Sequence, residues 1–341
     1  MYGGELIAKQ GRTCVFKPEI PCKGKKKKIK SKRKKRVSKI IFSKKSKEKL
    51  KQEKNITRKI KSIPHSNQWA VLFDEFCKPP TLKKIIQLYP SFKKCTEGQK
   101  SKLIKNFNKN SQMMNGIYGG LTFEKHFKKI KLNDKDFLQL MKMMVPLFKG
   151  LTILKKNNVS HLDIKYSNIV LHNHSFKYID FGFSYYLPDL KNIRKRSKSE
   201  FDTDRIYQFY PLEFIYSSAN HKELNEEYDY YDSRKNYKFF KSINSLFHRN
   251  TKDIVLETIK RIQSKKINQK KLFQKVDVYS LGLVIPTLFI KYKYPIELIY
   301  ESEIIHDFFQ LFNKMTHPFY NERITCETAF QQFKLLIKKY N

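Results

Sequence analysis

The sequence has few acidic residues for its length of 341. Against 71 lysines and arginines stand 31 aspartates and glutamates, which gives a formal net charge of +40 at neutral pH. A charge of this size bears on solubility and partners and not on fold. Acidic proteins, nucleic acid and anionic membranes are candidate partners. A lysine-, asparagine- and isoleucine-rich coding bias with solvated lysine faces explains the charge equally well.

No pair of cysteines is spaced as Cys-x-x-Cys. The five cysteines are odd in number and scattered: Cys14, Cys22, Cys77, Cys95 and Cys326. This pattern argues against a disulfide framework and against a zinc site. It favours a reducing compartment, in which cysteines remain thiols. We therefore expect an intracellular protein with unpaired cysteines.

Neither a targeting signal nor a membrane span is evident. The start, Met1 to Glu5, has no charged stretch followed by an apolar one, and Tyr2 excludes N-myristoylation. The longest apolar run, Leu281 to Ile290, contains Pro286 and is far shorter than the roughly 20 residues that cross a bilayer. We expect a soluble protein without membrane insertion.

One stretch in the middle of the chain carries the groups that phosphoryl transfer needs. It reads His161-Leu162-Asp163-Ile164-Lys165-Tyr166-Ser167-Asn168 and is followed, after an apolar run, by Asp180-Phe181-Gly182. Phosphoryl transfer needs one carboxylate for the acceptor hydroxyl, oxygen ligands for magnesium, and a cation for the moving group. The spacing Asp-x-Lys-x-x-Asn supplies three of these groups from one loop, and Asp180 supplies another. An ordinary hairpin turn explains each short string alone.

Together these motifs resemble the catalytic loop and the metal-binding signature of the eukaryotic-type serine/threonine protein kinase family. The resemblance implies a bilobal α+β fold with ATP and Mg²⁺ bound between a small antiparallel-sheet lobe and a larger helical lobe. It implies that Asp163 positions and deprotonates the acceptor hydroxyl and that Lys165 stabilises the transferring group. Asn168 and Asp180 would hold the magnesium.

The resemblance also divides the chain. It implies an N-terminal lobe at 1–112, a hinge at 113–120 and a C-terminal lobe at 121–341, with a basic loop at 23–36 and insertions at 78–110 and 217–270. The basic loop holds eleven Lys and Arg and no acid, which favours a disordered loop over a nuclear-targeting or nucleic-acid patch. We expect the insertion at 78–110 to be irregular. The insertion at 217–270 includes an acidic, tyrosine-rich stretch at 226–231 and suggests no chemistry.

Residues 5–21 read as a hairpin, and in the family such a hairpin carries a glycine-rich loop over the phosphates. This chain has other residues where glycines are usual: Ala8, Gln10 and Thr13. Side chains there prevent a close approach of the backbone to phosphate, so weaker or altered ATP binding is expected. Lys9 or Arg12 could compensate by direct charge. Ile7 and Val15 would contact the nucleotide.

The segment Val37 to Phe42 reads as the strand of the nucleotide lysine. By resemblance, Lys39 grips the first two phosphates, with Lys17 as the substitute, and Val37 completes an adenine roof with Val15. Residues 44–60 have helical periodicity and hold two acids, Glu48 and Glu53. Glu53 is better placed in the periodic segment to orient Lys39.

Further positions follow the same resemblance. Residues 69–73 read as an apolar strand and 137–156 as a core helix. The adenine edge would bond to the backbone around Ile117 and Tyr118, with Val170 beneath the ring. Structural support is expected from four residues: His161, Glu213, Asp277 and Arg323.

For two of these interactions the resemblance also implies the contacting groups. Asp277 would hold the backbone of the catalytic loop, and Arg323 would pair with Glu213. Leu162 stands where many kinases have an arginine that gathers a phosphorylated activation segment, expected here at 183–213. We therefore expect activity without phosphorylation of that segment.

The sequence thus predicts a protein kinase that transfers the γ-phosphoryl group of ATP to serine or threonine hydroxyls of protein substrates, with acidic ones preferred by charge. It is similar to kinases of large DNA viruses, which would place it in the host cytoplasm, the virion or the nucleus. Two alternatives stay open. One is a pseudokinase that serves as a scaffold, and the other is a basic nucleic-acid-binding protein on the same fold.

Overall fold

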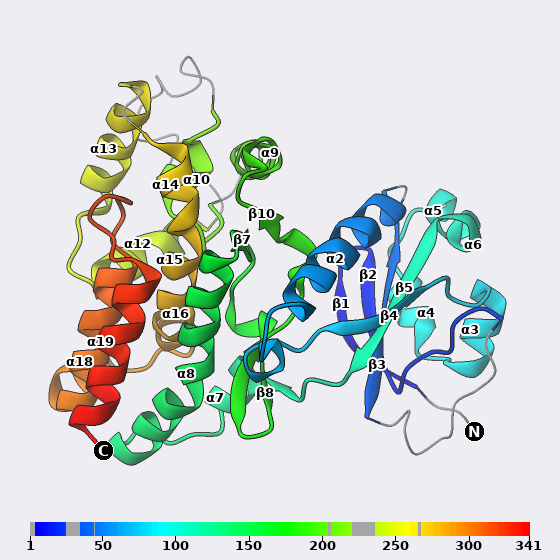
Figure 1. The fold of residues 1–341 in the computed structure, drawn as a ribbon, viewed down its shortest axis with the longest axis horizontal. Coiled ribbons are helices and arrows are strands. Elements are labelled where there is room, and N and C mark those ends of the chain that lie inside the picture. The colour runs from blue at the N-terminus through cyan, green and yellow to red at the C-terminus, as the bar shows by residue number, and fades with distance from the viewer. Residues whose placement is uncertain (1–3, 25–34, 44, 204–205, 220–235, 265–266) are drawn as a thin grey trace. The chain divides into compact units, whose positions relative to one another are not determined.

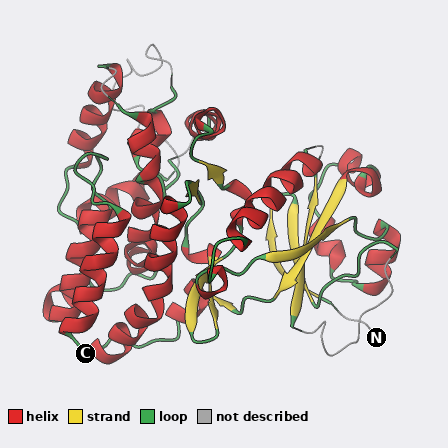
Figure 2. Cartoon of the chain, viewed as in Figure 1, coloured by secondary structure: helices red, strands yellow, loops and turns green. Residues whose placement is uncertain are grey.

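The structure, a computed structural model, describes residues 4–24, 35–43, 45–203, 206–219, 236–264 and 267–341. They form two compact units, Met1–Gly120 with Ile179–Gly182, and Leu121–Tyr178 with Phe183–Asn341. Both units contain helices and antiparallel strands, so the protein is of the α+β class (Figures 1 and 2).

The first unit is built on a five-stranded antiparallel sheet with the strand order β1-β2-β3-β5-β4. Its strands are β1 (Glu5–Gln10), β2 (Thr13–Lys17), β3 (Arg36–Phe42), β4 (Phe73–Cys77) and β5 (Ser111–Ile117). Its helices are α2 (Ser46–Lys61), α3 (Leu82–Leu88), α4 (Phe92–Thr96), α5 (Ser101–Lys105) and α6 (Phe107–Asn110). The strand expected at residues 69–73 is wrong in position, because the strand begins only at Phe73.

The two faces of this sheet have different covers, because side chains alternate along each strand. Val15 lies opposite Lys39 across β2 and β3, while Cys14 lies opposite Ile40. The Cys14 face packs against the insertion between β4 and β5, in a core that includes Phe92. Figure 1 shows α2 on one side of the sheet and α3 to α6 on the other. The prediction of an irregular insertion at 78–110 is therefore wrong, since this segment supplies helices that cover one sheet face.

The prediction of unpaired cysteines is also wrong. Disulfides join Cys14 to Cys95 and Cys22 to Cys77, and buried Cys326 is a free thiol. The bonded partners are 81 and 55 residues apart in sequence, so a search for short cysteine spacings misses them. The expectation of a reducing compartment rested on free thiols and loses its basis, because disulfides persist in oxidising surroundings.

The second unit is mainly helical. Its helices are α7 (Phe123–Phe127), α8 (Asp134–Lys156), α9 (Leu190–Phe201), α10 (Leu212–Tyr216), α12 (Tyr237–Leu246), α13 (Thr251–Gln263), α14 (Gln269–Gln274), α15 (Val276–Gly282), α16 (Val284–Lys291), α17 (Glu297–Glu301), α18 (Glu303–Met315) and α19 (Cys326–Lys339). Its short strands are β6 (Leu121–Thr122), β7 (Val159–Ser160), β8 (Ile169–His172), β9 (Ser175–Tyr178) and β10 (Tyr185–Tyr186). The hairpin β8–β9 and the pair β7–β10 flank the motif at residues 161–168.

Helix α8 is the central helix of this unit and leads toward that stretch. Asn133 caps it by accepting a hydrogen bond from the backbone N–H of Asp136 at 2.9 Å. Among the described residues it alone is long and apolar enough to cross a membrane, yet 56% of its most apolar window is buried in the protein. Helices 269–282 and 284–291 pass that test only as a pair, bent by 42°. Such burial is typical of a core helix, and no strong membrane insertion is indicated.

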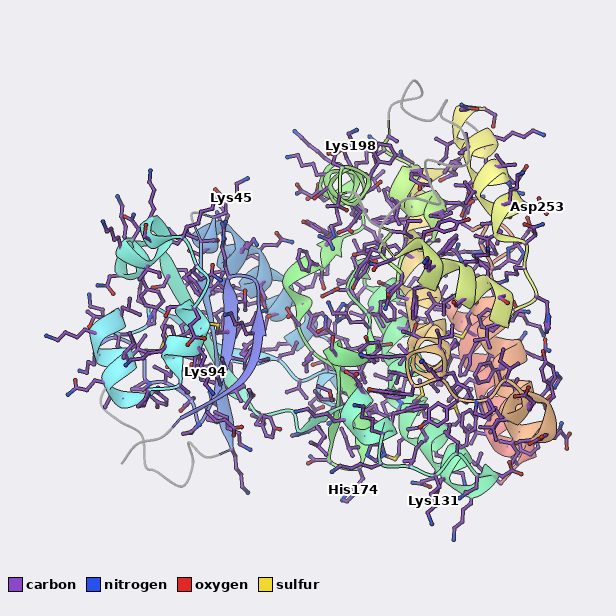
Figure 3. The ribbon with its side chains drawn as sticks, turned by 180° about the vertical axis from the view of Figure 1, so that it is seen from behind. Lys45, Lys94, Lys131, His174, Lys198 and Asp253 are labelled. Atoms are coloured by element: carbon purple, nitrogen blue, oxygen red, sulfur yellow. A yellow bond between two sulfur atoms is a disulfide. The ribbon has the colours of Figure 1, made fainter. Side chains whose placement is uncertain are left out.

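Many of the described lysines are exposed. Lys45, Lys94 and Lys131, labelled in Figure 3, are among them. Most of the basic loop expected at 23–36 and the whole acidic stretch at 226–231 lie outside the described residues. The described remainder of the insertion at 217–270 is largely helical, in α12, α13 and the start of α14.

Candidate functional site

The motif at 161–168 forms a loop whose backbone is held by one buried carboxylate. Asp277 at the start of α15 accepts hydrogen bonds from the backbone N–H groups of His161 at 2.7 Å and Leu162 at 2.8 Å. Its Oδ2 also accepts the Ser160 hydroxyl at 2.7 Å. Three donors on one carboxylate fix the entry to the loop, which is the role that the sequence predicts for Asp277.

Asp163 is the centre of a cluster of hydrogen-bond donors, which we call the Asp163 cluster. Lys165 Nζ lies 3.0 and 3.1 Å from its two carboxylate oxygens. Asn168 Nδ2 donates to Asp163 Oδ2 at 2.7 Å and to its carbonyl oxygen at 2.9 Å. Because the amide nitrogen makes both bonds, Asn168 Oδ1 is the atom that could bind a cation. Asp163 itself is buried and keeps its carboxylate oriented by cationic and amide donors.

The fourth member of the Asp163 cluster was missed from the sequence. Tyr207 donates its hydroxyl to Asp163 Oδ1 at 3.0 Å, and its ring packs edge-on against Tyr210 at 4.8 Å between centroids. Burial and the negative charge of Asp163 raise the pKa of Tyr207 well above its ordinary value. Tyr207 therefore remains a donor at any physiological pH. Only its place in the aromatic stretch after α9 could have drawn attention to it.

Two non-glycine residues of the motif adopt left-handed backbone conformations. Leu162 has φ of 51° and Asp180 has φ of 61°. Such conformations are uncommon for residues with a side chain and cost about 1–3 kcal/mol each, and they cluster at functional sites. The Asp277 bonds to the backbone of the loop help to hold Leu162 in this conformation.

In the first unit the structure brings together three charged residues, which we call the Lys39 cluster. Lys39 Nζ on β3 lies 3.1 Å from both carboxylate oxygens of Glu53 on α2. It also lies 2.7 Å from Asp180 Oδ1. Lys39 and Glu53 are buried. Glu48, the other acid that the sequence offers as a partner for Lys39, is exposed. The structure thus places Glu53, and not Glu48, beside Lys39.

Burial and charge act in opposite directions within the Lys39 cluster. Burial lowers the pKa of Lys39, but the charges of Asp180 and Glu53 outweigh it and raise that pKa above its ordinary value. Burial raises the pKa of Glu53, an effect that the charge of Lys39 opposes and that of Asp180 reinforces. One ammonium thus contacts two carboxylates, and Asp180 is the carboxylate less deeply buried.

Gly182 packs closely against this cluster. A Cβ at position 182 would lie 3.1 Å from both Asp180 Oδ1 and Glu53 Oε2. Both oxygens contact Lys39, so a side chain here would need both carboxylates to shift by a few tenths of an ångström within their ion pairs. This close packing favours the glycine in Asp180-Phe181-Gly182.

The residues expected to contact the adenine and the phosphates differ in their exposure. Val37 and Val170 are buried, Ile7 and Val15 are half-buried, and Ile117 is half-exposed. The N–H of Tyr118 already donates to Lys35 O at 2.9 Å, so this donor is not free for an adenine edge as expected. The substitute Lys17 lies over the Tyr118 ring, 3.8 Å from its centroid.

Lys9 does not serve as a free charge on the hairpin. Its ammonium donates to the carbonyl oxygens of Lys94 at 2.8 Å and Glu97 at 3.0 Å, at the end of α4. The expectation that Lys9 compensates for the absent glycines by direct charge is therefore wrong. Arg12 is exposed near the turn of the hairpin, where Gly11 has φ of 55°.

Glu213 and Arg323 form the ion pair expected from the sequence. Their charged atoms lie 3.7 Å apart, and both side chains are fully buried. Arg323 also donates to the carbonyl oxygens of His317 at 2.8 Å and Pro318 at 2.7 Å, and Glu213 Oε2 accepts the N–H of Tyr320 at 2.7 Å. Burial raises the pKa of Glu213 to about 7, despite the nearby charge of Arg323.

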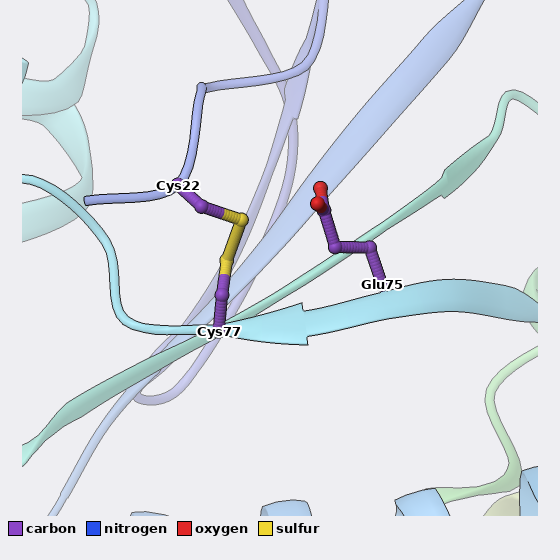
Figure 4. A group of neighbouring side chains, drawn as sticks. All are labelled: Cys22, Glu75 and Cys77. Atoms are coloured by element: carbon purple, nitrogen blue, oxygen red, sulfur yellow. A yellow bond between two sulfur atoms is a disulfide. The ribbon is translucent and has the colours of Figure 1, made fainter. Parts of the chain in front are cut away.

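A second group in the first unit has the composition of a metal site. Cys22, Glu75 and Cys77 lie with their ligand atoms within 4.8 Å of one another (Figure 4). The two sulfurs are bonded to each other, however, and a disulfide has no thiolate to offer a metal. Asn115 Nδ2 donates to Glu75 Oε2 at 2.9 Å and so holds this carboxylate. The group therefore acts as a structural tie between β4 and the segment after β2.

A scan against models of protein families gives no match, and a search of curated proteins finds no match either.

Proposed function

We propose that this protein is a serine/threonine protein kinase, which transfers the γ-phosphoryl group of ATP to hydroxyls of protein substrates. The observation that carries the proposal is the buried Lys39 cluster, in which one ammonium contacts Glu53 at 3.1 Å and Asp180 at 2.7 Å. A lysine held by a helix carboxylate and by the metal-binding aspartate is the arrangement that kinases need for the phosphates. The Asp163 cluster supplies the complementary groups.

The residues divide the work by their chemistry. Asp163, held by donors on both oxygens, accepts the proton of the acceptor hydroxyl. Lys165, 3.0 Å from Asp163, neutralises charge on the transferring group. Asn168 Oδ1 and the Asp180 carboxylate are hard oxygen ligands of the kind that Mg²⁺ prefers. Lys39, oriented by Glu53, contacts the phosphates.

Magnesium held by these residues would neutralise the charge of the phosphoryl group that ATP would supply. Each unit offers donors of the type these groups take: Lys39 and the Asp180 carboxylate in the first unit, and Lys165 and the Asn168 amide oxygen in the second. The hairpin β1–β2 fits less well, since Ala8, Gln10 and Thr13 stand where glycines would allow close backbone contact. We therefore expect a high KM for ATP.

The direct test is transfer of labelled phosphate from ATP with Mg²⁺ to acidic, neutral and basic carrier proteins. Asp163→Asn keeps the size of the side chain but removes the base, and general-base loss costs about 10²–10⁴-fold in rate. The matched control is Asp253→Asn, an exposed acid at the start of α13 (Figure 3). Equal labelling by Asp163→Asn and the unmodified protein would overturn the proposal. Field steering by the charge of +40 predicts faster labelling of acidic carriers.

A pseudokinase is the second candidate, favoured by the side chains of Ala8, Gln10 and Thr13 at positions where glycines are usual. It predicts nucleotide binding that needs Lys39 but no phosphate transfer. Equilibrium binding of a fluorescent ATP analogue to the unmodified protein and to Lys39→Met, measured beside the transfer assay, separates the two functions. Binding without transfer on any carrier would favour the scaffold.

A further inference from the structure

The hairpin β1–β2 is held along its length by the segment 81–99, which contains α3 and α4 and which we call the clasp. The covalent link is the disulfide between Cys14 on β2 and Cys95 on α4. Beside it the rings of Phe16 and Phe92 stack with centroids 5.0 Å apart. All four side chains are buried, so the second strand of the hairpin and α4 share one apolar core.

Polar contacts extend this attachment to the rest of the hairpin. At its start, Ser91 Oγ donates to Gly4 O at 2.6 Å. On β1, Lys9 Nζ donates to two carbonyl oxygens at the end of α4, at 2.8 and 3.0 Å. At the turn, Gln99 Nε2 donates to Gly11 O at 3.0 Å. The clasp therefore contacts the hairpin before β1, on β1, at the turn and on β2.

The clasp lies on the sheet face opposite Lys39. Cross-strand partners share a face, and Val15 is the partner of Lys39 whereas Cys14 is the partner of Ile40. The side chains of Cys14 and Phe16 thus point toward the clasp, and that of Val15 points toward the Lys39 face. The clasp can fix the hairpin without occupying the space beside Lys39.

We propose that the clasp positions the hairpin for nucleotide binding and that the Cys14–Cys95 disulfide is its lock. The inference rests on the proposed function, because it takes the Lys39 face as the nucleotide face. A hairpin with Ala8, Gln10 and Thr13 where glycines are usual has a less adaptable backbone toward the phosphates, so its position must be fixed in advance. A preorganised loop loses less conformational freedom on binding and binds more tightly. Lys9 and Gln99 are positioning residues in this arrangement.

Reduction breaks the Cys14–Cys95 disulfide. A dithiol such as dithiothreitol gives two electrons and two protons to the disulfide, closes to its own cyclic disulfide, and leaves thiols at Cys14 and Cys95. The hairpin then keeps only its packing and hydrogen bonds to the clasp. The proposal predicts a rise in KM for ATP on reduction, with little change in kcat, since the Asp163 cluster contains no part of the hairpin.

The experiment measures kcat and KM for ATP in the oxidised protein, in the dithiothreitol-treated protein and in two double variants. Cys14→Ser/Cys95→Ser should raise KM for ATP about tenfold, about 1.4 kcal/mol of binding free energy, and should not respond further to reduction. Cys22→Ser/Cys77→Ser, which removes the other disulfide of the same unit, should keep the KM of the oxidised unmodified protein and still respond to reduction. An equal response of both variants, or an unchanged KM in Cys14→Ser/Cys95→Ser, would overturn the proposal.

Hydrogen exchange of the unmodified protein gives a second readout that needs neither variant nor activity. Reduction should speed exchange of backbone amides in residues 5–17 and leave those of β5 protected. Unchanged exchange in residues 5–17 would also overturn the clasp as a lock. If the oxidised protein neither binds nor turns over ATP, the proposed kinase function fails while the exchange experiment still decides the role of the clasp.

Discussion

The two units hold their central carboxylates in different ways. Asp163 lies in a loop whose other members, Lys165 and Asn168, follow within five residues, and donors surround it. Asp180 belongs to a cluster assembled from residues 14 and 141 positions apart from Lys39, with Glu53 on a helix and Asp180 on a distant segment. One centre is local in sequence and rich in donors, and the other is built by the fold and is rich in negative charge.

Because of this difference, the geometry of the two clusters depends on different parts of the structure. A local cluster survives as long as its loop keeps its shape, and that shape is set by buried supports such as Asp277. A cluster assembled by the fold depends on the placement of a strand, a helix and a distant segment at once. Substitutions in the supports should therefore act on stability in the second unit, while substitutions in the Lys39 cluster should act on nucleotide binding.

The largest effect should come from breaking the buried support of the second unit. Arg323→Ala removes hydrogen bonds to the carbonyl oxygens of His317 and Pro318 and leaves the Glu213 carboxylate buried without its cation. Loss of one partner of a buried pair costs about 3–5 kcal/mol. Urea unfolding should show this loss, whereas Arg58→Ala, at an exposed position on α2, should change stability by less than about 0.5 kcal/mol. A similar small change in Arg323→Ala would show that the pair is not a support.

The next effect tests the centre of the first unit. Lys39→Met removes the ammonium from between Glu53 and Asp180 and should lower phosphate transfer about 10²-fold, the cost of losing one preorganised charge-stabilising group. Lys51→Met, at an exposed position on the same helix as Glu53, is the control. The transfer assay should show the loss at saturating acceptor protein. Full activity of Lys39→Met would assign the phosphates to another cation and remove the assumed role of the Lys39 cluster.

The contrast also explains how much the sequence could predict. Asp163, Lys165 and Asn168 are visible because a short motif places them in one loop, and the strand and helix of Lys39 and Glu53 follow from periodicity. The pairings Cys14–Cys95 and Cys22–Cys77 depend on how the helices between β4 and β5 fold back on the sheet. No local sequence pattern shows that these helices pack against the sheet and bring the cysteines together. The bonds of Lys9 to α4 were missed for the same reason.

The pH dependence of unfolding tests whether the positive charge of Arg323 fully offsets the cost of burying the Glu213 carboxylate. Its pKa is raised from 4.5 to about 7 in the folded protein, so between these values the folded state binds more protons than the unfolded state. The free energy of unfolding therefore falls as pH rises from about 4.5 to about 7, by on the order of 3 kcal/mol at most. Below pH 4.5 this contribution is fully present, and above pH 7 it is lost.

Glu213→Gln should remove this part of the pH dependence, because the amide does not ionise. Unfolding by urea at pH 5 and at pH 8 measures the difference for the variant and for the unmodified protein. Glu257→Gln, a partly exposed acid on α13, should retain the full dependence. An identical slope in Glu213→Gln and the unmodified protein would mean that Arg323 compensates the carboxylate completely.

The smallest effect concerns the one member of the Asp163 cluster that comes from outside the loop. Tyr207→Phe keeps the ring packing against Tyr210 but removes the hydrogen bond of 3.0 Å to Asp163 Oδ1. A hydrogen bond to a charged group contributes about 1.5–3 kcal/mol at most, and Lys165 still contacts both oxygens of Asp163, so a decrease in kcat of about tenfold is expected. Tyr186→Phe, at an exposed position on strand β10, is the control. A rise in kcat would instead show that the phenol competes with the acceptor hydroxyl for Asp163, because both donate to the same carboxylate.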